Sequence, residues 1–219
     1  MSGVVHLLRH GQSDCTRADR FCSRHDPELN DVGRAMARAA AASVPSPRAI
    51  YTSPAARARQ TAEIVGSTPQ VLDDLRELDY GSWDDLPKSA VEGTGAYRAW
   101  LEDPAEVAPP GGETAREVAA RAGAALDWIR RRHDGEEVLV VTHKATIRIL
   151  VCHYLGVPLR SFRDRIAAPA GSFTSVGFGP RGPILLRLAD VAHLPAAWRA
   201  DPDRATLDSE PAAAEKLTG

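Results

Sequence analysis

Residues 4–13 read VVHLLRHGQS, in which a short strand-forming run leads directly into Arg-His-Gly at positions 9–11. Two other Arg-His pairs occur, at 24–25 and at 132–133. The former lies in a predicted loop. The latter lies at the end of a predicted helix, where a cation interacts favourably with the helix dipole. Only the pair at 9–10 follows a strand expected near the centre of a sheet, so this stretch indicates both a central strand and a site at its end.

Short apolar runs alternate with helical segments along the rest of the chain. The predicted strands span residues 4–8, 49–53, 70–72, 138–141, 173–178 and 184–188. The predicted helices span residues 31–44, 54–65, 113–132 and 144–155. The run at 138–141 is apolar throughout, which is typical of a strand buried on both faces of a sheet. Strands separated by helices pair in parallel, so we expect an α/β fold: a three-layer α/β/α sandwich with a mostly parallel central sheet.

The length of 219 residues fits one domain, which we expect to span residues 1–190. Residues 73–111 hold turns, Pro and Gly around one short helical piece, and the part at about 80–111 is interpreted as a small lid or insertion. After residue 190 the sequence is rich in Ala, Pro and Asp without periodicity, which predicts a loosely packed tail over 191–219.

The composition is that of an ordinary globular protein, with 43% hydrophobic and 26% charged residues. A net charge of −2 gives no indication of a nucleic acid or a membrane as partner, and no apolar stretch is long enough to cross a membrane. Cys15, Cys22 and Cys152 form neither a disulfide framework nor a closely spaced metal pair, and no signal peptide is recognisable. We expect a cytoplasmic protein. The sequence leaves its oligomeric state open, with a homodimer as one alternative.

Three polar segments directly follow predicted strands: RHG at 9–11, SPAARARQTA at 53–62 and THK at 142–144. Ligands of open α/β sheets bind beyond the carboxyl ends of the strands. We therefore expect the three segments to form one site. Nearly all cations of the chain are arginines, whose planar fork matches the geometry of a phosphate or a carboxylate.

Five blocks of sequence carry a resemblance to a known family. They are LLRHGQS at 7–13, SPAARARQTAEIV at 53–65, LRELDYGSW at 75–83, PPGGET at 109–114 and VLVVTHKATIRIL at 138–150. In this order they resemble the histidine phosphatase superfamily with its phosphoglycerate-mutase-like fold, over roughly residues 3–160. The resemblance implies phosphoryl transfer to and from a small phosphorylated metabolite, with no metal and no cofactor.

By its match to the family motif, His10 would be the nucleophile and would form a phosphohistidine, since an imidazole can take the phosphoryl group itself. The alternative is a structural histidine. Arg9 and Arg57 match the arginines that clamp the phosphoryl group in the family. Arg59 lies two residues further along the same predicted helix and should point elsewhere.

Two more catalytic candidates come from the same resemblance. His143 matches the second family histidine, which hydrogen-bonds the phosphoryl group; the alternative is a buried histidine without a role in binding. Glu77 matches the acid/base position, where one carboxylic acid protonates the leaving group and then activates water. The neighbouring carboxylates that remain as alternatives are Asp73, Asp74 and Asp79.

The residues predicted to bind substrate are those at which the chain departs from the family or matches its variable loop. Many relatives have Asn where Thr16 stands, so Thr16 or Ser13 would supply that hydrogen bond. Lys144 follows the second histidine where many relatives have Gly, and it points either into the pocket or to solvent. The segment DRFCSRHD at 19–26 aligns with the loop that contacts substrate in the mutase branch. Its specificity candidates are Arg20, Cys22 and Ser23.

Other phosphatase chemistries lack their motifs. No Cys is followed by a five-residue spacer and Arg, the sequence DPDRA at 201–205 follows no apolar strand, and no GxxxxGK or metal-ligand cluster occurs. We therefore interpret the chain as a metal-independent phosphomonoester hydrolase. The alternatives are a phosphoglycerate-type mutase, disfavoured by the compact segment 84–110, and a catalytically inactive scaffold that binds phospho-ligands.

Overall fold

Six strands form one sheet in the order β3-β2-β4-β1-β5-β6 in the computed structural model, which describes residues 3–44, 47–66 and 68–199. The strands are β1 Gly3–Arg9, β2 Ala49–Thr52, β3 Gln70–Val71, β4 Glu137–Thr142, β5 Phe173–Gly179 and β6 Gly182–Asp190. The helices are α1 Asp14–Arg17, α2 Asp31–Ala41, α3 Ala56–Val65, α4 Gly95–Glu102, α5 Ala115–Arg132, α6 Lys144–Leu155 and α7 Phe162–Arg165. Strands β1 to β4 pair in parallel, and the hairpin of β5 and β6 adds two antiparallel pairings.

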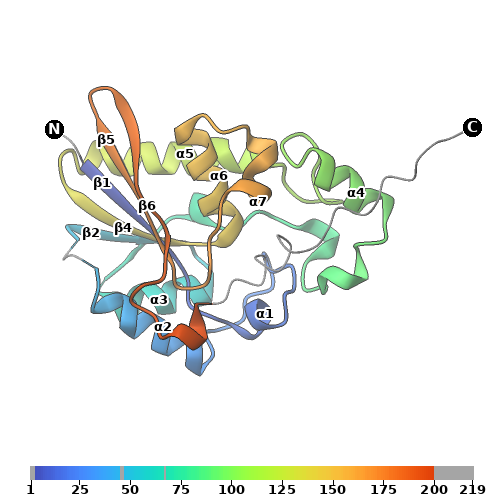
Figure 1. The fold of residues 1–219 in the computed structure, drawn as a ribbon, viewed down its shortest axis with the longest axis horizontal. Coiled ribbons are helices and arrows are strands. Elements are labelled where there is room, and N and C mark those ends of the chain that lie inside the picture. The colour runs from blue at the N-terminus through green and yellow to red at the C-terminus, as the bar shows by residue number, and fades with distance from the viewer. Residues whose placement is uncertain (1–2, 45–46, 67, 200–219) are drawn as a thin grey trace, which may run out of the picture.

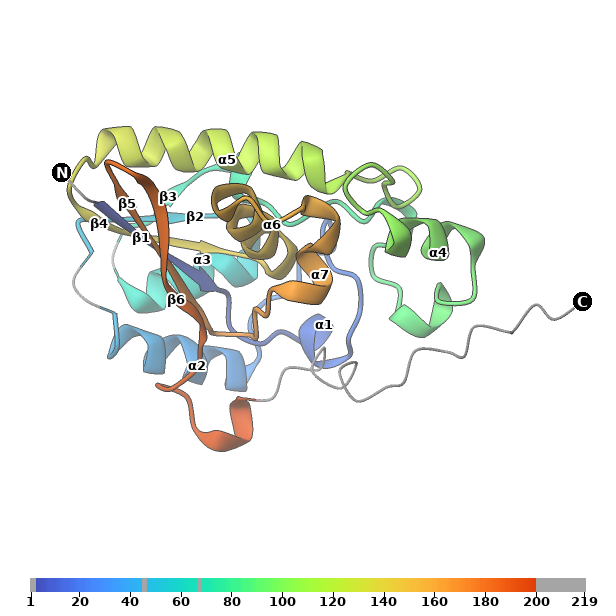
Figure 2. The same ribbon diagram turned by 45° about the horizontal axis from the view of Figure 1, so that its top comes forward.

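The sheet lies between two layers of helices (Figures 1 and 2), with α5 and α6 on one face and α2 and α3 on the other. Side chains alternate between these faces along β4. Val138 and Val140 pack in the cluster that contains α5 and α6, whereas Leu139 and Val141 pack with the alanines of α2 and α3. The three-layer sandwich with a mostly parallel sheet is thereby confirmed.

The pairing of β1 with β4 brings the two central strand ends together. In the parallel register Arg9 lies opposite Thr142, and the N–H of His10 donates to the carbonyl oxygen of Thr142 at 3.0 Å. Gly11 then passes close to α2: a Cβ added at Gly11 would lie 2.9 Å from the Cα of Gly33. The glycine after His10 is therefore required by this close backbone approach.

Several element boundaries differ from the predictions. Helix α2 ends at Ala41, three residues before the expected end, and α3 begins at Ala56 rather than at Pro54. The N–H of Ala56 donates to the carboxylate of Asp26 at 2.7 Å, so the start of α3 depends on a contact from another loop. The short helices α1 and α7 were not predicted, because four residues display no helical periodicity.

The segment interpreted as an insertion carries α4, which lies beyond α7 at the end of the molecule farthest from the start of β1 (Figure 1). Its aromatic side chains form a separate buried cluster with a residue of the loop after α1. The cluster consists of Phe21, Trp83, Val91, Tyr97 and Trp100. The division into one domain with a lid stays a prediction.

The predicted tail falls mostly outside the described residues, which end at 199. Within 191–199, Leu194 is buried and a single 3₁₀ turn spans Ala196–Trp198. In the part of the chain that the structure describes, no helix combines the length and the apolar character needed to cross a membrane.

Candidate active site

A cavity of about 90 Å³ lies at the carboxyl ends of β1 and β4, next to the first turns of α3 and α6. Four of the five predicted catalytic residues line it: Arg9, His10, Arg57 and Glu77. Of the six residues predicted to bind substrate, Thr16, Arg20, Cys22 and Lys144 line it. The structure thus gathers eight sequence-predicted residues from six separate segments around one small space.

The ring of His10 is fixed in one tautomer by its two neighbours. Its Nδ1 lies 2.7 Å from the carbonyl oxygen of Gly11, which can only accept, so Nδ1 carries the hydrogen. The Nε of Arg57 can only donate, and it lies 3.3 Å from His10 Nε2, which therefore holds a lone pair. Burial lowers the pKa of His10 well below its usual value of 6.5, and the Arg57 and Arg9 guanidinium groups lower this pKa further. The imidazole is consequently neutral near pH 7.

Arg57 and Arg9, the two arginines predicted to bind the phosphoryl group, are both held by backbone carbonyl oxygens. Arg57 is 1% exposed and donates to the carbonyl oxygens of Cys22 at 3.0 Å and His25 at 3.3 Å. Arg9 donates to the carbonyl oxygen of Ala168 at 2.6 Å. Arg57 Nη1 also lies 3.5 Å from the Asp26 carboxylate, and together these contacts fix the two guanidinium groups. Arg59 is exposed, as its spacing predicted.

The loop at 22–25, which receives Arg57, is itself held by the carboxylate of Asp84. Asp84 accepts from the backbone N–H groups of Ser23 at 2.6 Å, Arg24 at 3.2 Å and His25 at 2.6 Å, and from the Ser23 hydroxyl at 2.8 Å. Partial burial raises the pKa of Asp84, but these hydrogen bonds outweigh it and leave the pKa below its usual value. Asp84 therefore influences the surroundings of His10 indirectly, because it holds the 22–25 loop and that loop holds Arg57.

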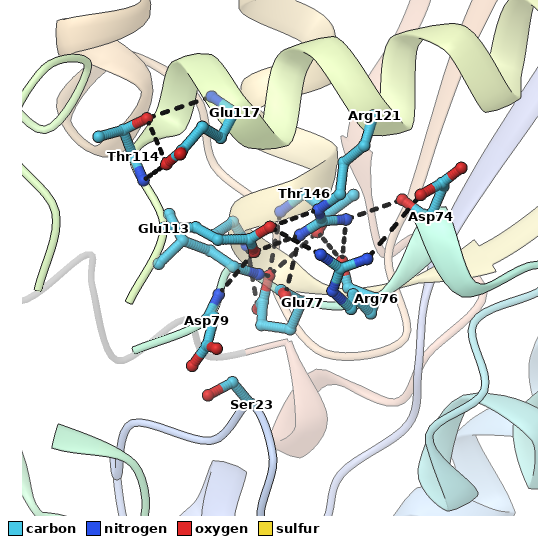
Figure 3. Close-up of polar contacts among 12 residues, drawn as sticks. Ser23, Asp74, Arg76, Glu77, Asp79, Glu113, Thr114, Glu117, Arg121 and Thr146 are labelled. Atoms are coloured by element: carbon cyan, nitrogen blue, oxygen red, sulfur yellow. Dashed lines mark hydrogen bonds and ion pairs between the residues drawn. The ribbon is translucent and has the colours of Figure 1, made fainter. Parts of the chain in front are cut away.

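The carboxylate of Glu77 lies at the N-terminus of α6 (Figure 3). It accepts from the N–H of Ala145 at 3.2 Å and from the N–H and hydroxyl of Thr146 at 3.1 and 3.2 Å. The N-cap residue of α6, His143, makes no side-chain cap hydrogen bond, so Glu77 supplies the acceptors that a capping side chain normally provides. Among the four neighbouring carboxylates considered in the sequence, Glu77 alone lines the cavity.

The backbone that carries Glu77 is clamped by Arg121 of α5, which reaches across to it in Figure 3. Arg121 donates to the carbonyl oxygens of Asp74 at 2.7 Å, Arg76 at 3.0 Å and Glu77 at 3.1 Å. Its other contact is an ion pair with Glu113 at 2.8 Å. A carboxylate held through its own backbone and through a helix N-terminus has little freedom to move.

His143 is fully buried next to His10 and does not line the cavity. The two ring centroids are 5.1 Å apart. His143 Nε2 lies 2.7 Å from the Ser53 hydroxyl, which accepts from the N–H of Ala55 at 3.3 Å. The buried Nδ1 has no hydrogen-bond partner among the described residues. Burial, followed by Arg57 and His10, lowers the pKa of His143 well below 6.5.

Two of the predicted substrate-binding residues do not line the cavity. Ser13 is fully buried and caps α1, where its hydroxyl accepts from the N–H of Thr16 at 3.3 Å. Ser23 is engaged by Asp84 and by the N–H of Tyr80 at 3.1 Å. Both hydroxyl groups are used to shape loops, a role that a motif match does not distinguish from ligand binding.

Sequence reasoning missed part of the cavity wall. The additional lining cations are Lys88, Arg148 and Arg163, and the aromatic residues are Phe21, Tyr80, Trp100 and Phe162. Arg148 lies four residues after Lys144 on the predicted helix, so helical spacing could have found it. Nothing in the local pattern marks the other cations. No cluster of three or more His, Cys, Asp or Glu side chains within residues 3–44, 47–66 and 68–199 is arranged to hold a metal ion.

Comparisons with known proteins identify the family. The family model for the histidine phosphatase superfamily (branch 1) matches residues 5–191. A metal-independent phosphoserine phosphatase from Arabidopsis thaliana is 34% identical over 201 residues, covering 87% of this chain and 82% of that protein. A 2,3-bisphosphoglycerate-dependent phosphoglycerate mutase from Rhizobium meliloti is 33% identical over 167 residues, covering 69% of this chain and 79% of the mutase.

A solved structure shares the fold. It is that of a phosphoserine phosphatase mutant from Entamoeba histolytica in complex with phosphoserine. The TM-score is 0.82 at 19% identity, over 88% of this chain and 99% of the other. The chain belongs to the histidine phosphatase superfamily and is a phosphatase of that superfamily, which confirms the resemblance found in the sequence.

Replacement of Asp84 by Ala should lower kcat/KM by roughly tenfold to a hundredfold, because the 22–25 loop would no longer hold Arg57 against His10. Asp84→Asn keeps one oxygen acceptor and should recover part of the loss. The matched control is Asp134→Ala, an exposed aspartate far along the chain. Steady-state kinetics and thermal unfolding of all three variants test this. Equal kinetics in Asp84→Ala and the control would contradict the positioning role.

The two buried histidines should make stability depend on pH. Their pKa values are lowered in the folded state, so below pH 6.5 the unfolded chain binds more protons and the folded state loses stability as pH falls. Each contributes at most about 1.4 kcal/mol per pH unit. Urea unfolding at pH 7.5, 6.5 and 5.5 should give a smaller loss for His10→Asn than for wild type. Identical pH slopes in His10→Asn and wild type would refute this explanation.

Proposed function

We propose that this chain is a metal-independent phosphomonoester hydrolase that acts on a small phosphorylated metabolite through a phosphohistidine on His10, with Glu77 as general acid and base. The observation that carries the proposal is the tautomer of His10. Its Nδ1 hydrogen is engaged by the carbonyl oxygen of Gly11, and its Nε2 lone pair faces the guanidinium of Arg57 at the cavity.

In the first step His10 Nε2 attacks phosphorus in line, and the bond from phosphorus to the leaving oxygen breaks. Arg57 and Arg9 donate to the equatorial oxygens, on which the charge of the transition state is spread. The positive charge that develops on the imidazole is stabilised by the Nδ1–H bond to Gly11. Glu77, as the carboxylic acid, gives its proton to the leaving oxygen, and the N–H groups of α6 stabilise the carboxylate formed.

In the second step water attacks the phosphohistidine. The Glu77 carboxylate takes a proton from the water, the bond from phosphorus to Nε2 breaks, and inorganic phosphate leaves. His10 and Glu77 both return to their starting states. Glu77 thus donates a proton when the substrate is cleaved and accepts a proton when the phosphohistidine is hydrolysed.

His143 is proposed to donate to the phosphoryl group. The Ser53 hydroxyl accepts from Ala55, so its own hydrogen is available to His143 Nε2, and Nδ1 then carries the ring hydrogen. That buried Nδ1 lacks an acceptor among the described residues, and its ring lies beside His10. A phosphoryl oxygen held on His10 would supply the acceptor.

Hydrolysis is favoured over a mutase reaction by the short segment at 84–110 and by the 34% identity to a relative named as a phosphatase. A mutase must keep its phosphoenzyme from water, whereas a compact insertion leaves room for water. The 33% identity to a mutase keeps that reaction as the second candidate.

The direct test is phosphate release from a panel of phosphomonoesters in EDTA, with wild type beside His10→Ala. Wild type should retain its rate in EDTA, and His10→Ala should lose at least about 10⁴-fold in kcat because the nucleophile is gone. The exposed-histidine control His153→Ala should behave as wild type. Interconversion of 2- and 3-phosphoglycerate without phosphate release would make the chain a mutase. Full activity in His10→Ala, or no turnover of any compound, would contradict the proposal.

Glu77→Gln should separate the two steps. With p-nitrophenyl phosphate the leaving group needs no proton, so the variant should release a burst of about one nitrophenolate per active site and then turn over slowly. With an alkyl phosphate, kcat should fall by about 10²–10⁴-fold and no burst should occur. Stopped-flow absorbance measures the burst, and His10→Ala is the control that lacks it. An unchanged steady-state rate in Glu77→Gln would exclude the assigned role.

A further inference from the structure

Arg163, in the four-residue helix α7, lines the same cavity as His10 but takes no part in the proposed phosphoryl transfer. Its guanidinium carbon lies 4.2 Å from the centroid of the Trp100 ring and 5.9 Å from that of Tyr97. Its Nη1 is buried without a hydrogen-bond partner among the described residues. A buried guanidinium donor without an acceptor is costly, so a ligand acceptor that reached it would be stabilised.

More cations than carboxylates line the cavity. The lining cations are Arg9, Arg20, Arg57, Lys88, Lys144, Arg148 and Arg163, and the lining carboxylates are Asp19 and Glu77. Lys88 pairs with Asp19 at 3.1 Å and Arg20 with Asp85 at 3.2 Å. Arg9 and Arg57 serve the phosphoryl group, which carries at most two negative charges. Arg163 stands on the part of the cavity wall formed by α6, α7 and the insertion, away from Arg9 and Arg57 in the sequence.

The form of the Arg163 site fits a carboxylate. A guanidinium stacked on an indole ring is held in one plane, with its N–H groups directed outward from the edge. Such an edge matches the two oxygens of a carboxylate in a bidentate arrangement.

We propose that Arg163 selects the substrate by binding a carboxylate carried on the same molecule whose phosphoryl group His10 attacks. This inference rests on the proposed phosphatase function. Trp100 of the insertion acts as a positioning residue, because its ring fixes the plane of the guanidinium. The insertion thereby influences substrate choice through a residue that lies outside it.

The experiment compares substrates that differ only in the carboxylate. O-phospho-L-serine and O-phosphoethanolamine form one pair, and 3-phosphoglycerate and sn-glycerol 3-phosphate form another. Wild type should favour the carboxylate member by at least about tenfold in kcat/KM, mainly through KM. Arg163→Gln should bring the ratio within each pair close to one. Arg163→Lys keeps the positive charge but lacks the planar guanidinium, so its ratio of kcat/KM within each pair should lie between those of wild type and Arg163→Gln. The control Arg165→Gln, an exposed arginine of the same helix, should keep the wild-type ratio.

The outcomes separate this inference from the function on which it rests. Equal kcat/KM within both pairs in wild type would overturn the carboxylate site and leave the phosphatase standing. Failure to hydrolyse any of these compounds or p-nitrophenyl phosphate would overturn both. A wild-type ratio preserved in folded Arg163→Gln would show that another residue binds the carboxylate. Faster hydrolysis of fructose 1,6-bisphosphate than of either carboxylate substrate would assign the second group as a phosphate and overturn the proposal. Because the wild-type ratios need no variant, misfolding of Arg163→Gln leaves the carboxylate site testable.

Discussion

The hydrogen bond from His10 Nδ1 to the carbonyl oxygen of Gly11, 2.7 Å long, is the contact on which the site depends. It determines which ring nitrogen has a lone pair. Directly after His10, Gly11 lies against the backbone of Gly33 in α2, where a side chain would not fit. The tripeptide Arg-His-Gly is therefore one unit: a strand end that supplies a cation, the proposed nucleophile, and a backbone that orients its ring.

The second constraint is the burial of several positive groups around a neutral histidine. Burial of cations is costly, and here the carbonyl oxygens of Cys22, His25 and Ala168, together with the Asp26 carboxylate 3.5 Å from Arg57, offset part of that cost. A carbonyl oxygen fixes a guanidinium without adding a negative charge beside it. The loop that supplies two of these carbonyl oxygens is held by Asp84, and the backbone that carries Glu77 is held by Arg121. Two charged residues outside the cavity thereby position the groups that line it.

The sequence predicted the parts of the site that depend on strand ends. Arg9, His10 and His143 follow buried parallel strands, so alternation of strands and helices was enough to bring them to one edge of the sheet. The choice of Glu77 over Asp73, Asp74 and Asp79 needed the family motif. Contacts between distant loops left no sequence pattern: Asp84 lies about 60 residues from the loop it holds, and α7, which carries Arg163, is too short for periodicity. Ser13 was considered as an alternative to Thr16 for the hydrogen bond that the Asn of many relatives makes, and in the structure its hydroxyl caps α1.

The most direct test of the central claim is identification of the atom that is phosphorylated during turnover. Wild-type enzyme quenched in alkali while it hydrolyses p-nitrophenyl phosphate can be digested, and phosphorus-31 resonance of the phosphopeptide distinguishes the two imidazole nitrogens. We predict an acid-labile phosphoryl group on Nε2 of His10, because the hydrogen on Nδ1 is engaged by the carbonyl oxygen of Gly11. A phosphoryl group on Nδ1, on another residue, or on none while turnover proceeds would contradict it.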